Sequence, residues 1–261
     1  MSMRYHIDTI PVWDALKLEG ECFLCALRRK TELGEAERYL GASVMEPDTR
    51  IQVNRKGFCP KHQEMLFGMS NRLGHALMLE SHMTETRERT EKSFAALRKA
   101  AAAYSEASML DRLSKKGQSA KQAFEKATEE IAALSHSCIM CDSIEDNMNR
   151  YLHTFFHLYQ TDTEFRTRFS ASKGVCLPHM ADLLRLAPEE LPAKEVAPFV
   201  EMLTGLEQQN LERIQEDVSW FIRKFDYRFS AEPWKNSQDA VERSVNKLRG
   251  WCVGQEPNPK E

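Results

Sequence analysis

The chain contains two copies of a cysteine and histidine pattern whose residue types and spacing are typical of metal ligands. Each copy joins a C-x-x-C motif to a C-x-x-H motif across a gap of 33 or 34 residues. The first copy comprises Cys22, Cys25, Cys59 and His62, and the second comprises Cys138, Cys141, Cys176 and His179. Six of the seven cysteines belong to the pattern, which indicates that it is not accidental. We therefore predict that each copy supplies three thiolates and one imidazole to one metal site.

The donor set favours zinc but leaves a second metal chemistry open. Three cysteines and one histidine fill all four positions of a tetrahedral structural zinc site, so we predict two zinc ions. Thiolates also hold iron–sulfur clusters, in which a histidine can replace a cysteine, so [4Fe–4S] clusters are the alternative. The aliphatic residues inside the two C-x-x-C motifs differ from common zinc-knuckle turns and keep the cluster interpretation open. Redox-active dithiols are a third interpretation, and buried cysteines without a metal are the simplest one.

Glycine and proline residues predict how the C-x-x-H halves are positioned. Gly57 and Gly174 each permit a sharp turn two residues before the cysteine, which then takes the N-cap position of a helix. Pro60 and Pro178 fall in the first helical turn, where a missing N–H costs little. The helix dipole and the free N–H groups would favour the thiolate form of each N-cap cysteine. The cysteines of each C-x-x-C motif are spaced to share one helix face.

The elements that position these residues read as helices, in an internally duplicated, mainly α fold. Similar residues recur around both copies, including a Lys-Gly step before each C-x-x-H motif. Apolar residues at spacings of three and four predict helices over 11–30, 35–45, 142–160 and 196–225, with Gly20 as a potential interruption of the first. Residues 76–134 read as a long helical hairpin broken at 116–119. Convincing strand alternation is missing, so few strands are expected.

We divide the chain into five predicted segments. Residues 1–75 form the first metal-binding repeat, 76–134 the long helical hairpin and 135–195 the second metal-binding repeat. Residues 196–228 form a long packing helix, with Phe199, Leu203, Ile214 and Phe225 among its expected buried residues. Residues 229–261 are a C-terminal helix and a flexible tail.

Composition limits the possible partners and compartments. The chain has 261 residues, with 36 basic and 39 acidic side chains and a formal net charge of −3, which argues against nucleic-acid binding. The N-terminus lacks the order of a secretory signal, and no apolar run reaches about 18 residues, so no membrane association is expected. We therefore predict a cytoplasmic protein, in which C-x-x-C pairs bind metals more often than they form structural disulfides.

The remaining histidines and the seventh cysteine carry weaker predictions. His153 and His157 are spaced four apart, and His75 and His82 seven apart, but each pair is more simply explained by packing. Their functional role is left open by the sequence. Cys252 is expected to be a partly buried thiol outside both sites.

Several further segments form a recognisable set with the two motifs: residues 10–15, 22–25, 56–59 with His62, 71–74, 172–176 with 178–179, 224–228 and 232–234. In these segments the chain resembles a family of bacterial proteins known only as a domain of unknown function, some members of which are labelled automatically as ABC-transporter substrate-binding proteins. The resemblance covers most of the chain. The resemblance implies no activity, and the transporter label conflicts with the missing signal sequence and the free thiols.

Together these patterns predict an intracellular metal-binding protein with two Cys3His sites, most simply structural zinc, and a scaffold or partner-binding role toward an unknown protein. An iron–sulfur redox or sensing protein is the first alternative. A metal-dependent enzyme, with acid–base chemistry from His153, His157 and Asp146, is the second. The sequence contains no Ser-His-Asp signature, phosphate-binding loop or H-E-x-x-H motif that would support catalysis.

Overall fold

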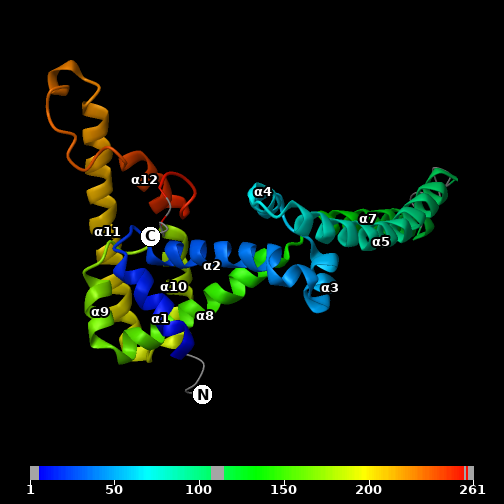
Figure 1. Cartoon of the computed structure of the whole chain (residues 1–261), viewed down its shortest axis with the longest axis horizontal. Coiled ribbons are helices and arrows are strands. Elements are labelled where there is room, and N and C mark those ends of the chain that lie inside the picture. The colour runs from blue at the N-terminus through cyan, green and yellow to red at the C-terminus, as the bar shows by residue number, and fades with distance from the viewer. Residues whose placement is uncertain (1–5, 107–114, 256, 258–261) are drawn as a thin grey trace. The chain divides into compact units, whose positions relative to one another are not determined.

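The fold is built from helices, as the sequence predicts. A computed structural model describes residues 6–106, 115–255 and 257, and no strand occurs among these residues. Along the chain (Figure 1) the elements are α1 (His6–Lys17), α2 (Phe23–Leu40), the 3-10 helix η1 (Ala42–Met45), α3 (Pro47–Lys56), α4 (Pro60–Gly68), α5 (Arg72–Glu106), α7 (Lys115–His136), α8 (Ile139–Thr161), α9 (Thr163–Ser170), α10 (Leu177–Glu190), α11 (Ala193–Arg223), the 3-10 helix η2 (Tyr227–Phe229) and α12 (Ala240–Arg249).

The order of helices repeats along the chain. The series α2, α3, α4 and α5 is followed by the similar series α8, α9, α10 and α11. In both series a C-x-x-C motif precedes or begins the first helix, and a C-x-x-H motif begins the third. The repeated order supports the predicted internal duplication.

The N-terminal helices differ from their predicted bounds. The helix expected over 11–30 is interrupted at 18–22, where Gly20 lies and Glu19 has a positive φ of 53°. As a result Cys22 lies just before the first turn of α2, and Cys25 lies within that turn. The helix expected over 35–45 is the end of α2 followed by η1.

The predicted helical hairpin is confirmed, but the residues at which its break was expected are helical. The helices α5 and α7 pack against each other along their lengths (Figure 1). Residues 116–119, where the break is expected, are helical and belong to α7. Gly117 lies in the first turn of α7 and does not interrupt it. Residues 107–114 lie outside the described part of the chain.

The chain forms two compact units. Unit 1 combines residues 1–32 with residues 144–261, and unit 2 comprises residues 33–143. The boundaries fall inside α2 and α8. Each unit therefore takes segments from both sequence copies.

The core of unit 1 is a cluster of aromatic rings beneath the start of α2. Phe155 is fully buried, and its ring centroid lies 4.8 Å from that of Phe169 and 5.9 Å from that of Phe23. The apolar residues predicted for the inner face of α8 are all buried: Ile144, Met148, Leu152, Phe155, Phe156 and Tyr159. Because Phe23 adjoins Cys22, this core fixes the position of the first C-x-x-C motif.

The core of unit 2 is smaller. Tyr39 is 1% exposed and its ring lies 5.4 Å from that of Phe58, the residue before Cys59. Val53, Leu66 and Met78 are also buried. The core thus lies directly behind the first C-x-x-H motif.

The end of α11 departs from prediction. Phe199, Leu203 and Ile214 are buried as expected, but Phe225 is 74% exposed because α11 ends at Arg223.

No helix in the described ranges has the length and apolar character needed to cross a membrane.

Candidate metal centres

The structure gathers the eight predicted ligands into two groups, but pairs them differently from the sequence prediction. Centre 1 consists of Cys22, Cys25, Cys176 and His179, and centre 2 of Cys59, His62, Cys138 and Cys141. The prediction that each sequence copy closes its own site is wrong. Each centre joins the C-x-x-C motif of one copy to the C-x-x-H motif of the other, and each lies within one unit.

Helix lengths give the physical reason for this exchange. From the first C-x-x-C motif the chain runs along α2, whose 18 residues span about 27 Å. The 10 residues of α3 span about 15 Å, so α3 alone cannot return the chain over that distance. In the second copy, the 23 residues of α8 carry the chain about 34 Å away and the 8 residues of α9 return about 12 Å. Neither copy returns to its own start.

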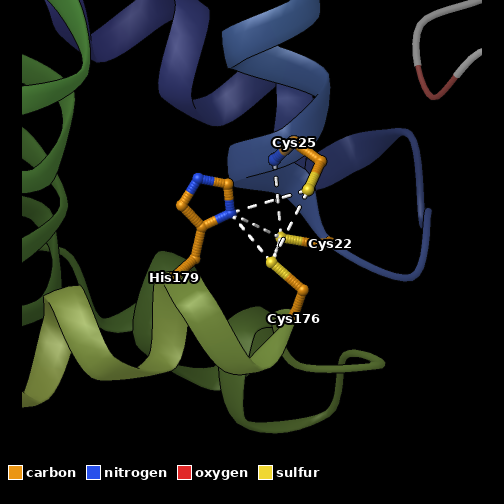
Figure 2. A group of neighbouring side chains, drawn as sticks. All are labelled: Cys22, Cys25, Cys176 and His179. Carbon is orange, nitrogen blue, oxygen red and sulfur yellow. Dashed lines mark hydrogen bonds between the residues drawn. The ribbon is translucent and has the colours of Figure 1, made fainter. Parts of the chain in front are cut away.

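Centre 1 is a compact set of four ligand atoms from α2 and α10 (Figure 2). The Cys176 Sγ atom lies 3.7 Å from the Sγ atoms of both Cys22 and Cys25. The Nδ1 atom of His179 lies 3.3, 3.6 and 3.1 Å from the sulfur atoms of Cys22, Cys25 and Cys176. All four ligand atoms lie within 4.8 Å of one another.

Centre 2 has the same arrangement. The Sγ atoms of Cys59 and Cys141 are 3.7 Å apart. The Nδ1 atom of His62 lies 3.3, 3.2 and 3.5 Å from the sulfur atoms of Cys59, Cys138 and Cys141. The two centres thus use the same atom types at nearly equal distances, as a duplication predicts.

The turn before each C-x-x-H motif forms as predicted. Gly57 and Gly174 have positive φ values of 63° and 73°, which residues with a Cβ rarely adopt. Cys59 and Cys176 are the N-cap residues of α4 and α10, with a proline in each first turn. This geometry brings each histidine beside the cysteine three residues before it.

Backbone N–H groups contact the sulfur atoms of both C-x-x-C motifs. The N–H of Cys25 donates to Cys22 Sγ, and the N–H of Cys141 donates to Cys138 Sγ, each at 3.4 Å. In centre 1 the N–H of Trp251 also donates to Cys25 Sγ, at 3.3 Å. Such bonds stabilise negative charge on sulfur, which metal binding requires.

In the absence of a metal, the cysteines within each centre differ in thiol pKa. Hydrogen bonds from Cys22 and Cys25 lower the pKa of the Cys176 thiol to about 4, and the bond that Cys25 donates to Cys176 raises its own pKa. Burial raises the pKa of Cys138, but the hydrogen bond with His62 and two backbone N–H groups outweigh it and bring the value to about 6. In each centre one cysteine therefore ionises at a lower pH than an ordinary thiol, which favours the thiolate form that metal binding requires.

A buried ion pair fixes the turn of centre 1. Lys247 Nζ lies 2.6 Å from Glu207 Oε2 and donates to the carbonyl of Lys173 at 2.8 Å, and both side chains are almost fully buried. Glu207 Oε1 accepts the N–H of Val175 and lies against Gly174, where an added Cβ would approach it to 2.1 Å. Burial raises the pKa of the Glu207 carboxyl in spite of Lys247 opposite. This ion pair was not predicted from the sequence. The one sequence feature that indicates it is Glu207 itself, an acidic residue next to the buried Leu206 on α11.

Different groups fix the turn of centre 2. The ring of His82 lies against Gly57, and its Nδ1–H donates to the carbonyl of Asn54 at 2.8 Å. The N–H of Ile139 donates to the carbonyl of Gly57 at 3.0 Å, and Ser137 Oγ donates to the carbonyl of Lys56 at 2.6 Å. These bonds join the start of α8 directly to the turn that carries Cys59.

The histidines outside the pattern belong to neither group. His153 Nδ1 lies 2.8 Å from Glu190 Oε1, and His75 Nε2 lies 2.8 Å from Gln63 Oε1. Burial lowers the pKa of His75. Within the part of the chain that the structure describes, the two centres are the only groups of three or more potential ligands. Cys252 is exposed, not partly buried as expected.

Comparison with known proteins gives a family but no activity. A family model described as "Family of unknown function (DUF6062)" matches residues 3–255, so the chain belongs to this family. The resemblance to an uncharacterised domain family is thereby confirmed. The chain matches none of the curated proteins and none of the solved structures with which it was compared.

Proposed function

We propose that this DUF6062 protein is a zinc protein in which one Zn²⁺ ion closes each unit, and that it acts as a scaffold for a protein partner rather than as an enzyme. The observation that carries the proposal is the size of the two ligand cages. In both, all four donor atoms lie within 4.8 Å of one another.

The measured edges fit a single tetrahedral ion. Zinc bonds of about 2.3 Å to sulfur and about 2.0 Å to nitrogen place two sulfur ligands about 3.8 Å apart and a sulfur about 3.5 Å from the nitrogen. Three of the sulfur–sulfur distances are 3.7 Å, and the other sulfur pairs lie within 4.8 Å. The sulfur–nitrogen distances run from 3.1 to 3.6 Å. Both cages are therefore the size that one zinc ion requires.

The same distances argue against the iron–sulfur alternative. In a [4Fe–4S] cluster each ligand binds a different iron atom on the outside of the cluster, so the ligands are spread around the whole cofactor. A cage whose sulfur atoms are 3.7 Å apart surrounds one metal atom. We therefore retain zinc as the proposed ion at both centres.

The closed ligand sets support a structural role. Catalytic zinc sites keep a position for water or substrate, whereas four protein ligands fill the coordination sphere. Each centre also joins segments that are far apart in the chain, so zinc binding would contribute directly to folding. Exposed apolar side chains beyond α11, including Phe225 at 74% and Tyr227 at 86%, support partner binding.

The test is metal analysis of the intact chain purified without added metal and under anaerobic conditions. We expect about two zinc ions per chain, no iron or sulfide and no visible colour. The variant Cys176→Ser should lose one zinc ion and keep the other, and Cys252→Ser, which alters the exposed cysteine outside both centres, should keep both. Retention of iron and acid-labile sulfide would contradict the proposal.

A further inference from the structure

The two centres differ in how far their cysteine residues are exposed to solvent. In centre 1, Cys22 is 7% exposed, Cys25 is 6% exposed and Cys176 is fully buried. In centre 2, Cys138 is buried, but Cys59 and Cys141 are only half-buried. The two centres have similar ligand geometry, but the cysteines of centre 2 are more accessible to reagents in solution than those of centre 1.

The C-terminal segment covers centre 1. After α12 the chain turns at Gly250, where an added Cβ would lie 3.9 Å from Cys176 Sγ. The next N–H, of Trp251, donates to Cys25 Sγ. A cavity of about 460 Å³ opens beside Cys22 and Cys25, yet it leaves both side chains at 7% exposure or less. The C-terminal segment thus keeps Cys22 and Cys25 buried even beside this cavity.

One side chain of α12 holds this segment in place. The Oδ1 atom of Asn246 accepts the N–H groups of Cys252 at 2.9 Å and Val253 at 3.2 Å. Its Nδ2 atom donates to the carbonyl of Val253 at 2.8 Å. The guanidinium of Arg29 lies 5.2 Å from the ring centre of Trp251, a cation–π contact from α2. Asn246 therefore holds the C-terminal segment against centre 1 without contacting any of the four candidate ligands.

The two more exposed cysteines of centre 2 are also neighbours. Cys59 Sγ and Cys141 Sγ are 3.7 Å apart, at the starts of α4 and α8. A disulfide has a sulfur–sulfur bond of about 2.05 Å, so the two atoms need to approach by less than about 2 Å. Accessible thiolates are oxidised before buried ones.

We infer that centre 2 is an oxidant-sensitive zinc site, at which a hydroperoxide joins Cys59 to Cys141 as a disulfide and releases the zinc ion, while centre 1 keeps its ion. The inference rests on the proposed zinc function and adds a modification site to it.

The chemistry balances with hydrogen peroxide as the oxidant. The thiolate of Cys59 or Cys141 attacks one peroxide oxygen, the O–O bond breaks, and a sulfenic acid and a hydroxide ion form. The second thiolate attacks the sulfenic sulfur, forming the S–S bond and expelling a second hydroxide ion. Two protons from solvent convert the hydroxide ions to water. Sulfur has then lost two electrons to peroxide, and zinc keeps only Cys138 and His62, too few ligands for retention.

The test treats the two-zinc protein with hydrogen peroxide, follows zinc release with a chromogenic chelator, and maps cysteines by alkylation and mass spectrometry. We expect one zinc ion per chain to leave at least about tenfold faster than the other, because accessibility governs thiolate oxidation. The first cross-linked peptide should join Cys59 to Cys141. Release of both ions at one rate, or a first cross-link within centre 1 or between Cys138 and Cys141, would overturn the inference.

A matched pair of variants tests the cover. Asn246→Ala should speed release of the second zinc ion and leave the first unchanged. Val241→Ala, at an exposed position of the same helix, should change neither rate. An unchanged second rate in Asn246→Ala would contradict the role of the C-terminal segment. A protein purified without zinc would instead contradict the proposed function, so the two failures are distinguishable.

Discussion

At the scale of single residues, the sequence predicts the local geometry of the C-x-x-H motifs correctly, and the structure gathers the eight candidate ligands into two groups. The glycine two residues before each N-cap cysteine adopts the positive φ that the pattern predicts. The groups packed against these glycines could not be predicted, because Glu207 and His82 come from helices whose packing depends on the whole fold. Both copies have the glycine turn, but a different side chain packs against it in each copy. This difference is consistent with two copies that diverged after duplication.

Gly174 gives a direct test at this scale. Gly174→Ala should lower the free energy of unfolding by about 1–3 kcal/mol, because alanine is strained at a positive φ and its Cβ would collide with Glu207. The control is Gly34→Ala inside α2, where an added Cβ has no neighbour within 4 Å and alanine should stabilise the helix by up to about 1 kcal/mol. Urea unfolding of the zinc-loaded proteins measures both. Equal effects of the two changes would contradict the turn geometry.

At the scale of elements, the sequence predicts which segments are helical and which helix faces are buried. It does not predict which helices come together at each centre. The inner face of α8 follows from its apolar spacing, and all six expected residues are buried. The exchange of motifs between centres does not follow from ligand spacing, since both pairings use the same residues. The unequal lengths of α2 and α3, 18 and 10 residues, become visible only in the structure, because the predicted helices had other bounds.

The start of α9 tests how one cap supports the core of unit 1. Asp162 Oδ1 accepts the N–H groups of Glu164 and Phe165, and Oδ2 accepts the indole N–H of Trp13 at 3.1 Å. Asp162→Ala removes both functions and should lower the free energy of unfolding by more than about 1 kcal/mol, the typical effect of losing a cap alone.

Trp13→Phe provides the comparison, because it removes the indole hydrogen bond and leaves the cap intact. Its effect should be the smaller of the two in thermal and urea unfolding. If Asp162→Ala costs no more than Trp13→Phe, the cap does not contribute as described.

At the scale of the whole molecule, each unit contains one centre, and each centre is closed only by combining the two sequence copies. Each copy has one C-x-x-C and one C-x-x-H motif, and in this fold these two motifs belong to different centres. The fold therefore requires both copies, and zinc binding would link folding of the N-terminal half to that of the C-terminal half. The sequence predicts the duplication, but this mutual dependence becomes visible only with the helices in place.

The most direct test of this account is NMR of the protein loaded with an NMR-active cadmium isotope, which correlates cysteine β-protons with the metal that each sulfur binds. The account predicts that Cys22, Cys25 and Cys176 share one cadmium resonance, and that Cys59, Cys138 and Cys141 share the other. A resonance shared by Cys22, Cys25 and Cys59 would contradict the exchanged pairing.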